Sequence, residues 1–93
     1  MIPKAKIEKI LHGNLAIEHL ELTDESAKHA GHTEAVRSGG GHFTLLVISR
    51  DFEGKKPIDR HKFIYRVLHQ EMRHSIHALS IKAYTPQEYQ SQE

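Results

Sequence analysis

The segment from His77 to Pro86 constrains the fold more than any other part of the chain. Its apolar residues recur at every second position, as Leu79, Ile81 and Ala83, and His77 shares their parity. Such alternation predicts a β-strand with His77 at its entry on the buried face. The next residues, Thr-Pro-Gln-Glu from Thr85, supply an N-cap, a proline at the first helical position and a capping glutamate. We therefore expect a strand that leads directly into a short helix.

Hydrophobic spacing predicts the remaining elements. Apolar residues at helical spacing predict a helix over Pro3–His12, and alternation predicts a half-buried strand over Glu18–Asp24. The segment His42–Ser49 is apolar on both faces, which is typical of a central strand. The longest helix is expected to run from Pro57 to about Arg73. The glycine-ending segment Ser26–Gly41 has no periodicity, and connections of that length tend to be functional or mobile.

The order of these elements predicts the topology. The first two strands most simply form an antiparallel pair, whereas the helix between the second and third strands favours a right-handed parallel crossover. We expect an α+β domain in helix-strand-strand-helix-strand-helix order, with helices packed on one face of a three-stranded mixed sheet. A chain of 93 residues has room for one hydrophobic core, so residues 1–93 are expected to form a single domain.

Composition narrows the functional classes. A formal net charge of +1 argues against a nucleic-acid polycation, and no apolar run approaches the length of a membrane span. The absence of cysteine excludes a thiolate-only metal site built by this chain alone, whereas nine histidines provide many imidazole ligands. The amino terminus lacks the apolar core of a signal peptide. We expect a cytoplasmic protein, although an organellar protein after presequence removal would look the same.

A set of short motifs, weak individually but specific in order and spacing, resembles the BolA family over nearly the whole chain. These motifs are Asp24-Glu25-Ser26, His29-Ala30-Gly31-His32, His42-Phe43, Phe52-Glu53-Gly54, Arg60-His61 with Tyr65, His77-Ala78-Leu79-Ser80 and Thr85-Pro86. The family's fold resembles a class II KH domain, which agrees with the order predicted above. Tyr89 stands where many relatives have tryptophan, a change expected to affect packing only.

This resemblance implies a non-enzymatic partner of a monothiol glutaredoxin in iron–sulfur cluster assembly, trafficking or iron sensing. In that pairing a [2Fe–2S] cluster lies between the proteins, with thiolates from the glutaredoxin and glutathione and histidine from the BolA side. The family's histidine in the last strand corresponds to His77, and its second ligand, in the loop between the first two strands, corresponds best to His29. Some relatives are also described as DNA-binding transcriptional regulators.

The residues themselves leave alternatives open. His77 can be a ligand or a strand-end histidine whose ring nitrogens are satisfied by the backbone. His32 and His42 are alternative second ligands, or polar residues of the loop and its end; only the resemblance favours His29. His42 can approach His77 if their strands are neighbours. Enzyme chemistry has little support, because Ser80 has the opposite strand parity to His77 and no oxyanion-forming turn is identifiable.

A basic stripe on the longest helix is the second candidate site. Its residues are Lys62, Arg66, His69 and Arg73, preceded by Lys55 and Lys56. Such a stripe can contact nucleic-acid phosphates, although a solvated helix face is the commoner explanation. The Gly-x-x-Gly loop with which KH domains hold a nucleic-acid backbone is absent, so the KH-like fold alone does not imply RNA binding.

Overall fold

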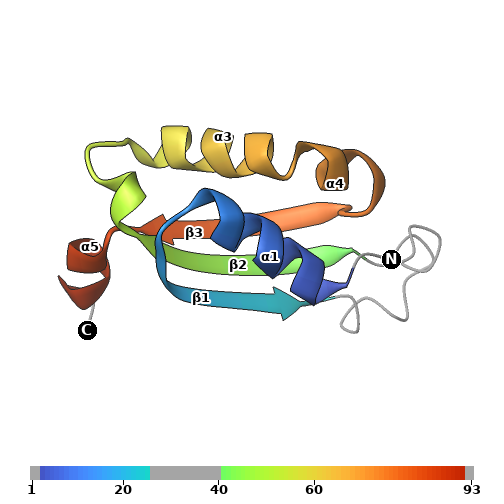
Figure 1. The fold of residues 1–93 in the computed structure, drawn as a ribbon, viewed down its shortest axis with the longest axis horizontal. Coiled ribbons are helices and arrows are strands. Elements are labelled where there is room, and N and C mark those ends of the chain that lie inside the picture. Colours follow the sequence, from blue (N-terminus) through green and yellow to red (C-terminus); the bar gives the residue numbers. More distant parts are fainter. Residues whose placement is uncertain (1–2, 26–40, 92–93) are drawn as a thin grey trace.

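The structure is a computed structural model that describes residues 3–25 and 41–91 (Figure 1). Its elements are α1 (Lys4–Asn14), β1 (Ile17–Asp24), β2 (His42–Ser49), the short 3-10 helix η2 (Arg50–Phe52), α3 (Pro57–Val67), α4 (His69–His74), β3 (Ala78–Tyr84) and α5 (Pro86–Ser91). The predicted α+β order is confirmed, with the longest helix divided in two. No helix in these ranges is long and apolar enough to cross a membrane.

The three strands form one mixed sheet in the order β1-β2-β3. Strand β2 is central, as its two apolar faces predict; it pairs antiparallel with β1 and parallel with β3. Leu45 stands at the centre of the sheet, opposite Leu22 on one side and Ile81 on the other. The predicted parity of β3 is confirmed, because Ile81 is buried while the polar residues between the apolar ones are exposed.

The core lies between the sheet and the helices of one face, α1 and α3 (Figure 1). Its fully buried apolar side chains come from α1, β2, η2 and α3 and include Ile7, Leu11, Leu45, Val47, Phe52 and Ile64. Burying each such side chain stabilises the fold by roughly 1.5–3 kcal/mol. These contacts, rather than the individual propensities of the helices, hold the sheet and the helices together.

The predicted single helix from Pro57 to Arg73 is interrupted at Leu68. The backbone of Leu68 has φ −99° and ψ 20°, and its N–H still donates to the carbonyl of Ile64 at 3.0 Å. Leu68 is fully buried, and the redirected α4 ends where the carbonyl of Glu71 accepts the N–H groups of Ser75 and Ile76. The interruption therefore brings the chain back to the sheet before β3. No glycine or proline marks it in the sequence.

The predicted start of the last helix is confirmed in atomic detail. Thr85 Oγ1 accepts the N–H of Glu88 at 3.2 Å, and the Glu88 carboxylate accepts the N–H of Thr85 at 2.8 Å. This reciprocal pair is a capping box. In α5, the ring of Tyr89 stacks on His19 at 6.0 Å and on Tyr84 at 6.3 Å between centroids. Both partners flank Ile48 on the face opposite α1 and α3, so Tyr89 covers one end of that face.

Arg60, part of the Arg60-His61 motif, is buried, which the sequence does not predict. The residue is only 5% exposed, and its side chain donates to the carbonyls of Lys55 and Ala83 at 2.9 and 3.1 Å. Its guanidinium also donates to both carboxylate oxygens of Glu88, at 2.6 and 3.1 Å. Arg60 therefore joins the start of α3 to the end of β3 and to α5. The Arg60 hydrogen bond, followed by the Thr85 N–H, lowers the pKa of Glu88 from 4.5 to about 2.

Candidate functional site

Two histidines meet where β2 and β3 begin. His42 is the first residue of β2 and stands opposite Ala78, the first residue of β3. Because the two strands are parallel, both begin at the same end of the sheet, which brings His77 beside His42. The ring centroids of His42 and His77 are 4.9 Å apart, with 47° between the ring planes. The predicted approach of His42 to His77 is confirmed.

The position of His77 corrects one prediction. The alternating pattern places His77 within the strand, on its buried face, but β3 begins at Ala78 and His77 lies exposed in the bend before it. Strand parity therefore does not apply to its side chain. Its backbone is fixed nevertheless, because the N–H groups of His77 and Ala78 both donate to the carbonyl of Gly41, at 2.8 and 3.2 Å. An exposed imidazole on a fixed backbone is accessible to a group on a partner protein.

Gly41 holds this arrangement through its own backbone conformation. Its φ of +83° is one that residues with a side chain rarely adopt. A Cβ atom at this position would lie 2.4 Å from the carbonyl oxygen of Ser75 and 3.1 Å from the nitrogen of His77. Glycine is therefore required both by the positive φ and by the close approach of the chain that leads into β3.

A shallow groove of about 270 Å³ adjoins the histidines. It is lined by Glu25, His42, Phe43, Thr44, Ala78, Leu79 and Ser80. At its rim the Thr44 hydroxyl donates to the Glu25 carboxylate at 3.2 Å, and the Glu25 N–H donates to the carbonyl of His42 at 2.6 Å. The Nε2 atom of His42 is buried, whereas the side chain of His77 is exposed. The two rings therefore present one interior and one surface imidazole.

The remaining predicted ligands, His29 and His32, lie outside the described residues. Within residues 3–25 and 41–91, no group of three or more potential ligands is arranged to hold a metal ion. This chain alone thus offers a two-imidazole site there. Neutral imidazole is a good iron ligand, and paired histidines bind one iron in Rieske-type [2Fe–2S] centres. The donor set therefore fits a cluster whose other ligands come from a partner.

The predicted basic stripe is exposed but is divided by the helix interruption. Lys55, Lys56, Lys62, Arg66 and Arg73 are all exposed, with Arg73 on α4 and the others on α3 or just before it. The ammonium group of Lys55 lies 4.8 Å from the ring centroid of Phe63. Within the described residues, the salt bridges join His19 to Glu21 and Arg60 to Glu88, so none of these five cations takes part in one. The stripe is consequently a solvated cationic face.

Comparison with known proteins agrees with the fold and with the motifs. The family model of BolA-like proteins matches residues 11–88. The chain is 42% identical over 88 residues to SufE-like protein 1, chloroplastic/mitochondrial, of Arabidopsis thaliana, covering 89% of this chain and 24% of that protein. It is 37% identical to the DNA-binding transcriptional regulator BolA of Haemophilus influenzae, over 76% of this chain and 67% of the relative.

Solved structures give the same result. BolA1 from Arabidopsis thaliana matches with a TM-score of 0.81 and 31% identity, covering 95% of this chain and 96% of that one. The BolA domain of SufE1 from the same plant matches with a TM-score of 0.79 and 37% identity, over 95% and 99% of the two chains. The chain spans only 57% of mouse BolA-like protein 1, to which it is 38% identical over 87 residues. In sequence and in fold, this chain belongs to the BolA family.

Proposed function

We propose that this protein is a non-enzymatic partner of a monothiol glutaredoxin that supplies histidine ligation to a shared [2Fe–2S] cluster. The observation that carries the proposal is the His42–His77 pair, with centroids 4.9 Å apart and His77 exposed. The chain contains no cysteine, so the thiolates that complete the cluster come from the glutaredoxin and from glutathione. Cluster assembly, cluster trafficking and iron sensing are the processes such a partner serves.

His77 is the primary ligand in this proposal. Its backbone is fixed by the Gly41 carbonyl while its ring is exposed, so a partner can bring an iron atom to it without displacing the core. His42 is the second ligand that the geometry supports, because it already adjoins His77. His29 is the second ligand that the family resemblance supports, with His32 as a further alternative. Replacing thiolate by imidazole raises the cluster's reduction potential and makes its ligation sensitive to protons.

The test mixes the purified protein with a cluster-loaded monothiol glutaredoxin and glutathione. We expect a heterodimer on a sizing column and a changed visible circular dichroism spectrum, both absent in His77→Ala. The matched control is His12→Ala, which removes an exposed histidine from α1 and should change neither signal. Separate His42→Ala and His29→Ala variants identify the second ligand. No heterodimer and an unchanged spectrum with the wild-type protein would rule out the proposal.

DNA binding is the second candidate, because relatives from Haemophilus influenzae and Vibrio cholerae are named DNA-binding transcriptional regulators. The exposed cations of the predicted stripe are the residues that would touch phosphates. Changing Lys62, Arg66 and Arg73 together to glutamine should reduce the salt dependence of DNA binding, by about one unit of log–log slope for each phosphate that is no longer neutralised. Absence of measurable affinity for duplex DNA at low salt would exclude this activity.

A further inference from the structure

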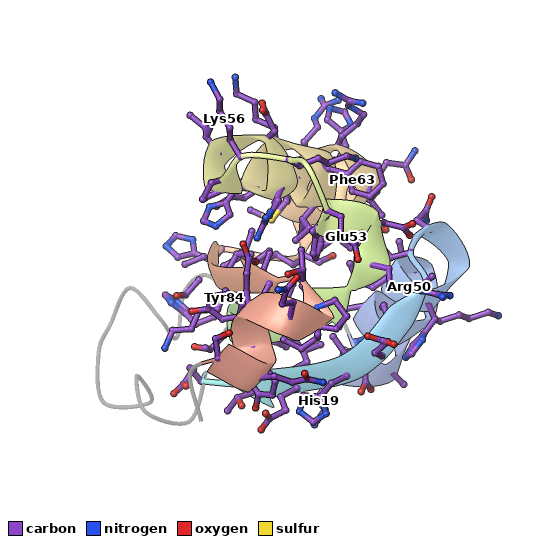
Figure 2. The ribbon with its side chains drawn as sticks, turned by 90° about the vertical axis from the view of Figure 1, so that its left-hand side faces the viewer. His19, Arg50, Glu53, Lys56, Phe63 and Tyr84 are labelled. Carbon is purple, nitrogen blue, oxygen red and sulfur yellow. The ribbon has the colours of Figure 1, made fainter. Side chains whose placement is uncertain are left out.

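A second and larger groove lies at the other end of β3. Its volume is about 910 Å³, and its walls come from the start of α3, the carboxyl end of β3 and α5. Figure 2 looks at this end of the molecule, with Lys56 at the top beside α3 and Tyr84 lower down on the β3 side. At about 3.3 Å per residue, the β3 residues that line the groove, Ile81 to Tyr84, begin roughly 13 Å along the chain from His77. The groove is therefore a separate site.

The floor of this groove is the outer edge of β3. The bond from the Ala78 N–H to the carbonyl of Gly41 shows that the main chain of Ala78 faces β2. Because the direction alternates along a strand, the main chains of Leu79, Ile81 and Ala83 face outward. Arg60 already donates to the Ala83 carbonyl at 3.1 Å, and Tyr65 to the Leu79 carbonyl at 3.4 Å.

These side-chain bonds leave an edge that is rich in donors. By this alternation, the N–H groups of Ile81 and Ala83 and the carbonyl of Ile81 face outward, and both residues line the groove; the Ala83 carbonyl accepts a hydrogen bond from the buried Arg60. A further β-strand can therefore pair only over a short stretch centred on Ile81. Strand addition at such an edge is a common way to bind an extended peptide. Because Arg60 and Tyr65 occupy the carbonyls of Ala83 and Leu79, a longer strand cannot pair along this edge, which limits self-association of the protein.

Beside the groove, α3 carries exposed apolar surface, although the α3 residues that line the groove itself are Pro57, Arg60 and His61. Ile58 is 60% exposed and Tyr65 is 41% exposed, and they are the large exposed hydrophobic side chains of the described residues. They are seven residues apart on α3, with His61 between them on the same flank. Tyr65 reaches the Leu79 carbonyl and His61 lines the groove, so this flank adjoins the edge of β3.

On the opposite side of the groove, Lys82 is an exposed cation. Lys82 follows Ile81 on β3, so its side chain projects from the face of the sheet away from α3. Glu88, which also lines the groove, is paired with Arg60, and Glu53 lies at the α3 end beside Gly54. A strand added beside Ile81 would place successive side chains alternately against the Ile58–Tyr65 flank and beside Lys82. A partner strand complementary to these two sides therefore has apolar residues alternating with acidic ones.

We propose that the outer edge of β3 binds an extended segment of a partner protein in which apolar and acidic residues alternate. The segment pairs through its main chain with Ile81. Its apolar side chains contact Ile58 and Tyr65, and a carboxylate lies beside Lys82. This site does not depend on the histidine pair or on a cluster.

The test uses an acetylated, amidated hexapeptide of alternating valine and glutamate as the probe. In amide NMR spectra of the full chain, the probe should shift the Ile81 and Ala83 N–H resonances and slow their hydrogen exchange. The amide of Leu22 is the control: the Glu25–His42 bond in the antiparallel ladder places its N–H on the outer edge of β1. An equal effect at Leu22, or no effect at Ile81 at millimolar probe, would overturn the proposal.

Charge reversal tests specificity. Lys82→Glu should weaken binding of the probe by at least about fivefold and should allow binding of the matching valine–lysine peptide. The control Lys9→Glu makes the same charge change on the exposed surface of α1 and should have no effect. Circular dichroism checks that both variants are folded. Equal affinity of wild-type protein for the two peptides, or shifts at Ile81 with single-stranded DNA but not with the peptide, would contradict a peptide site.

Discussion

Glu88→Gln tests whether the Arg60–Glu88 pair stabilises the fold. The glutamate carboxylate accepts two hydrogen bonds from the guanidinium and one from the Thr85 N–H, whereas glutamine offers one neutral oxygen. Arg60 is buried, so the substitution leaves its charge incompletely neutralised. The pKa of Glu88 is lowered from 4.5 to about 2, and one pKa unit corresponds to about 1.36 kcal/mol. The upper limit on what the ionised Glu88 carboxylate contributes, through Arg60 and Thr85 together, is therefore about 3 kcal/mol.

Solvent screening reduces this limit, because the Glu88 side chain is 45% exposed. We expect Glu88→Gln to lower the free energy of unfolding by about 1–2 kcal/mol at pH 7. A carboxylate with a lowered pKa stabilises the native state above its unfolded pKa, and this contribution disappears as pH falls through the folded pKa. The stability difference between wild type and variant should therefore shrink between pH 4.5 and about 2.

Urea unfolding followed by circular dichroism at pH 7, 4.5, 3 and 2.5 measures this difference. Glu53→Gln is the matched control, since Glu53 is exposed near the same groove and forms no salt bridge within the described residues. That variant should stay within about 0.5 kcal/mol of the wild type throughout. A difference between wild type and Glu88→Gln that is constant across the pH range would refute the assignment to an ionised Glu88.

Two further predictions concern the hydrogen bonds of Ser49, at the end of β2, and the histidine site. Ser49 is fully buried, and its hydroxyl donates to the Ala16 carbonyl at 2.9 Å and accepts the Asp51 N–H at 3.1 Å. Ser49→Ala should cost about 1–3 kcal/mol in urea unfolding, and a neutral result would show that water replaces both bonds. Lowering pH from 8 to 6 should weaken the cluster-bridged heterodimer, because protons compete with iron for the His77 imidazole. A sizing-column profile that is unchanged by pH would contradict histidine ligation.

The strands of the sheet are predictable because they carry strong local signals. The segment His42–Ser49 has the same bounds as β2, and its apolar character on both faces matches the central position. The capping box at Thr85 is predictable too, since both partners lie within four residues of each other. Signals of this kind depend on neighbouring residues alone, so one sequence is sufficient to interpret them.

The features that the sequence does not reveal depend on distant contacts. The sequence gives no local signal for the burial of Arg60, which depends on the carbonyls and the carboxylate from other elements that accept hydrogen bonds from its side chain. The interruption at Leu68 carries no glycine or proline and is set by packing around a fully buried leucine. The prediction of a buried face for His77 is wrong because it extends strand parity one residue beyond the true start of the strand. The approach of His42 to His77 follows from topology alone, and the structure confirms it.

Variants of His77 and Gly41 distinguish the loss of an iron ligand from the loss of the local backbone structure that positions it. The His77 side chain is exposed, so His77→Ala should change the free energy of unfolding by about 1 kcal/mol or less while abolishing the histidine-ligated spectrum. Gly41→Ala should cost more than about 2 kcal/mol, because it combines a positive φ with a Cβ placed 2.4 Å from the Ser75 oxygen. Since the Gly41 carbonyl holds the His77 backbone, cluster binding should fall in this variant too, although both imidazoles remain.

Urea unfolding and visible circular dichroism with the loaded glutaredoxin therefore give two different patterns. Stability and cluster binding should separate in His77→Ala and fall together in Gly41→Ala. Gly13→Ala is the matched control: its Cβ meets nothing within 4 Å, and it lies within α1. That variant should preserve the spectrum and stabilise the helix slightly. A Gly41→Ala protein with wild-type stability and spectrum would show that the loop backbone can relax, and that the position of His77 does not depend on the Gly41 carbonyl.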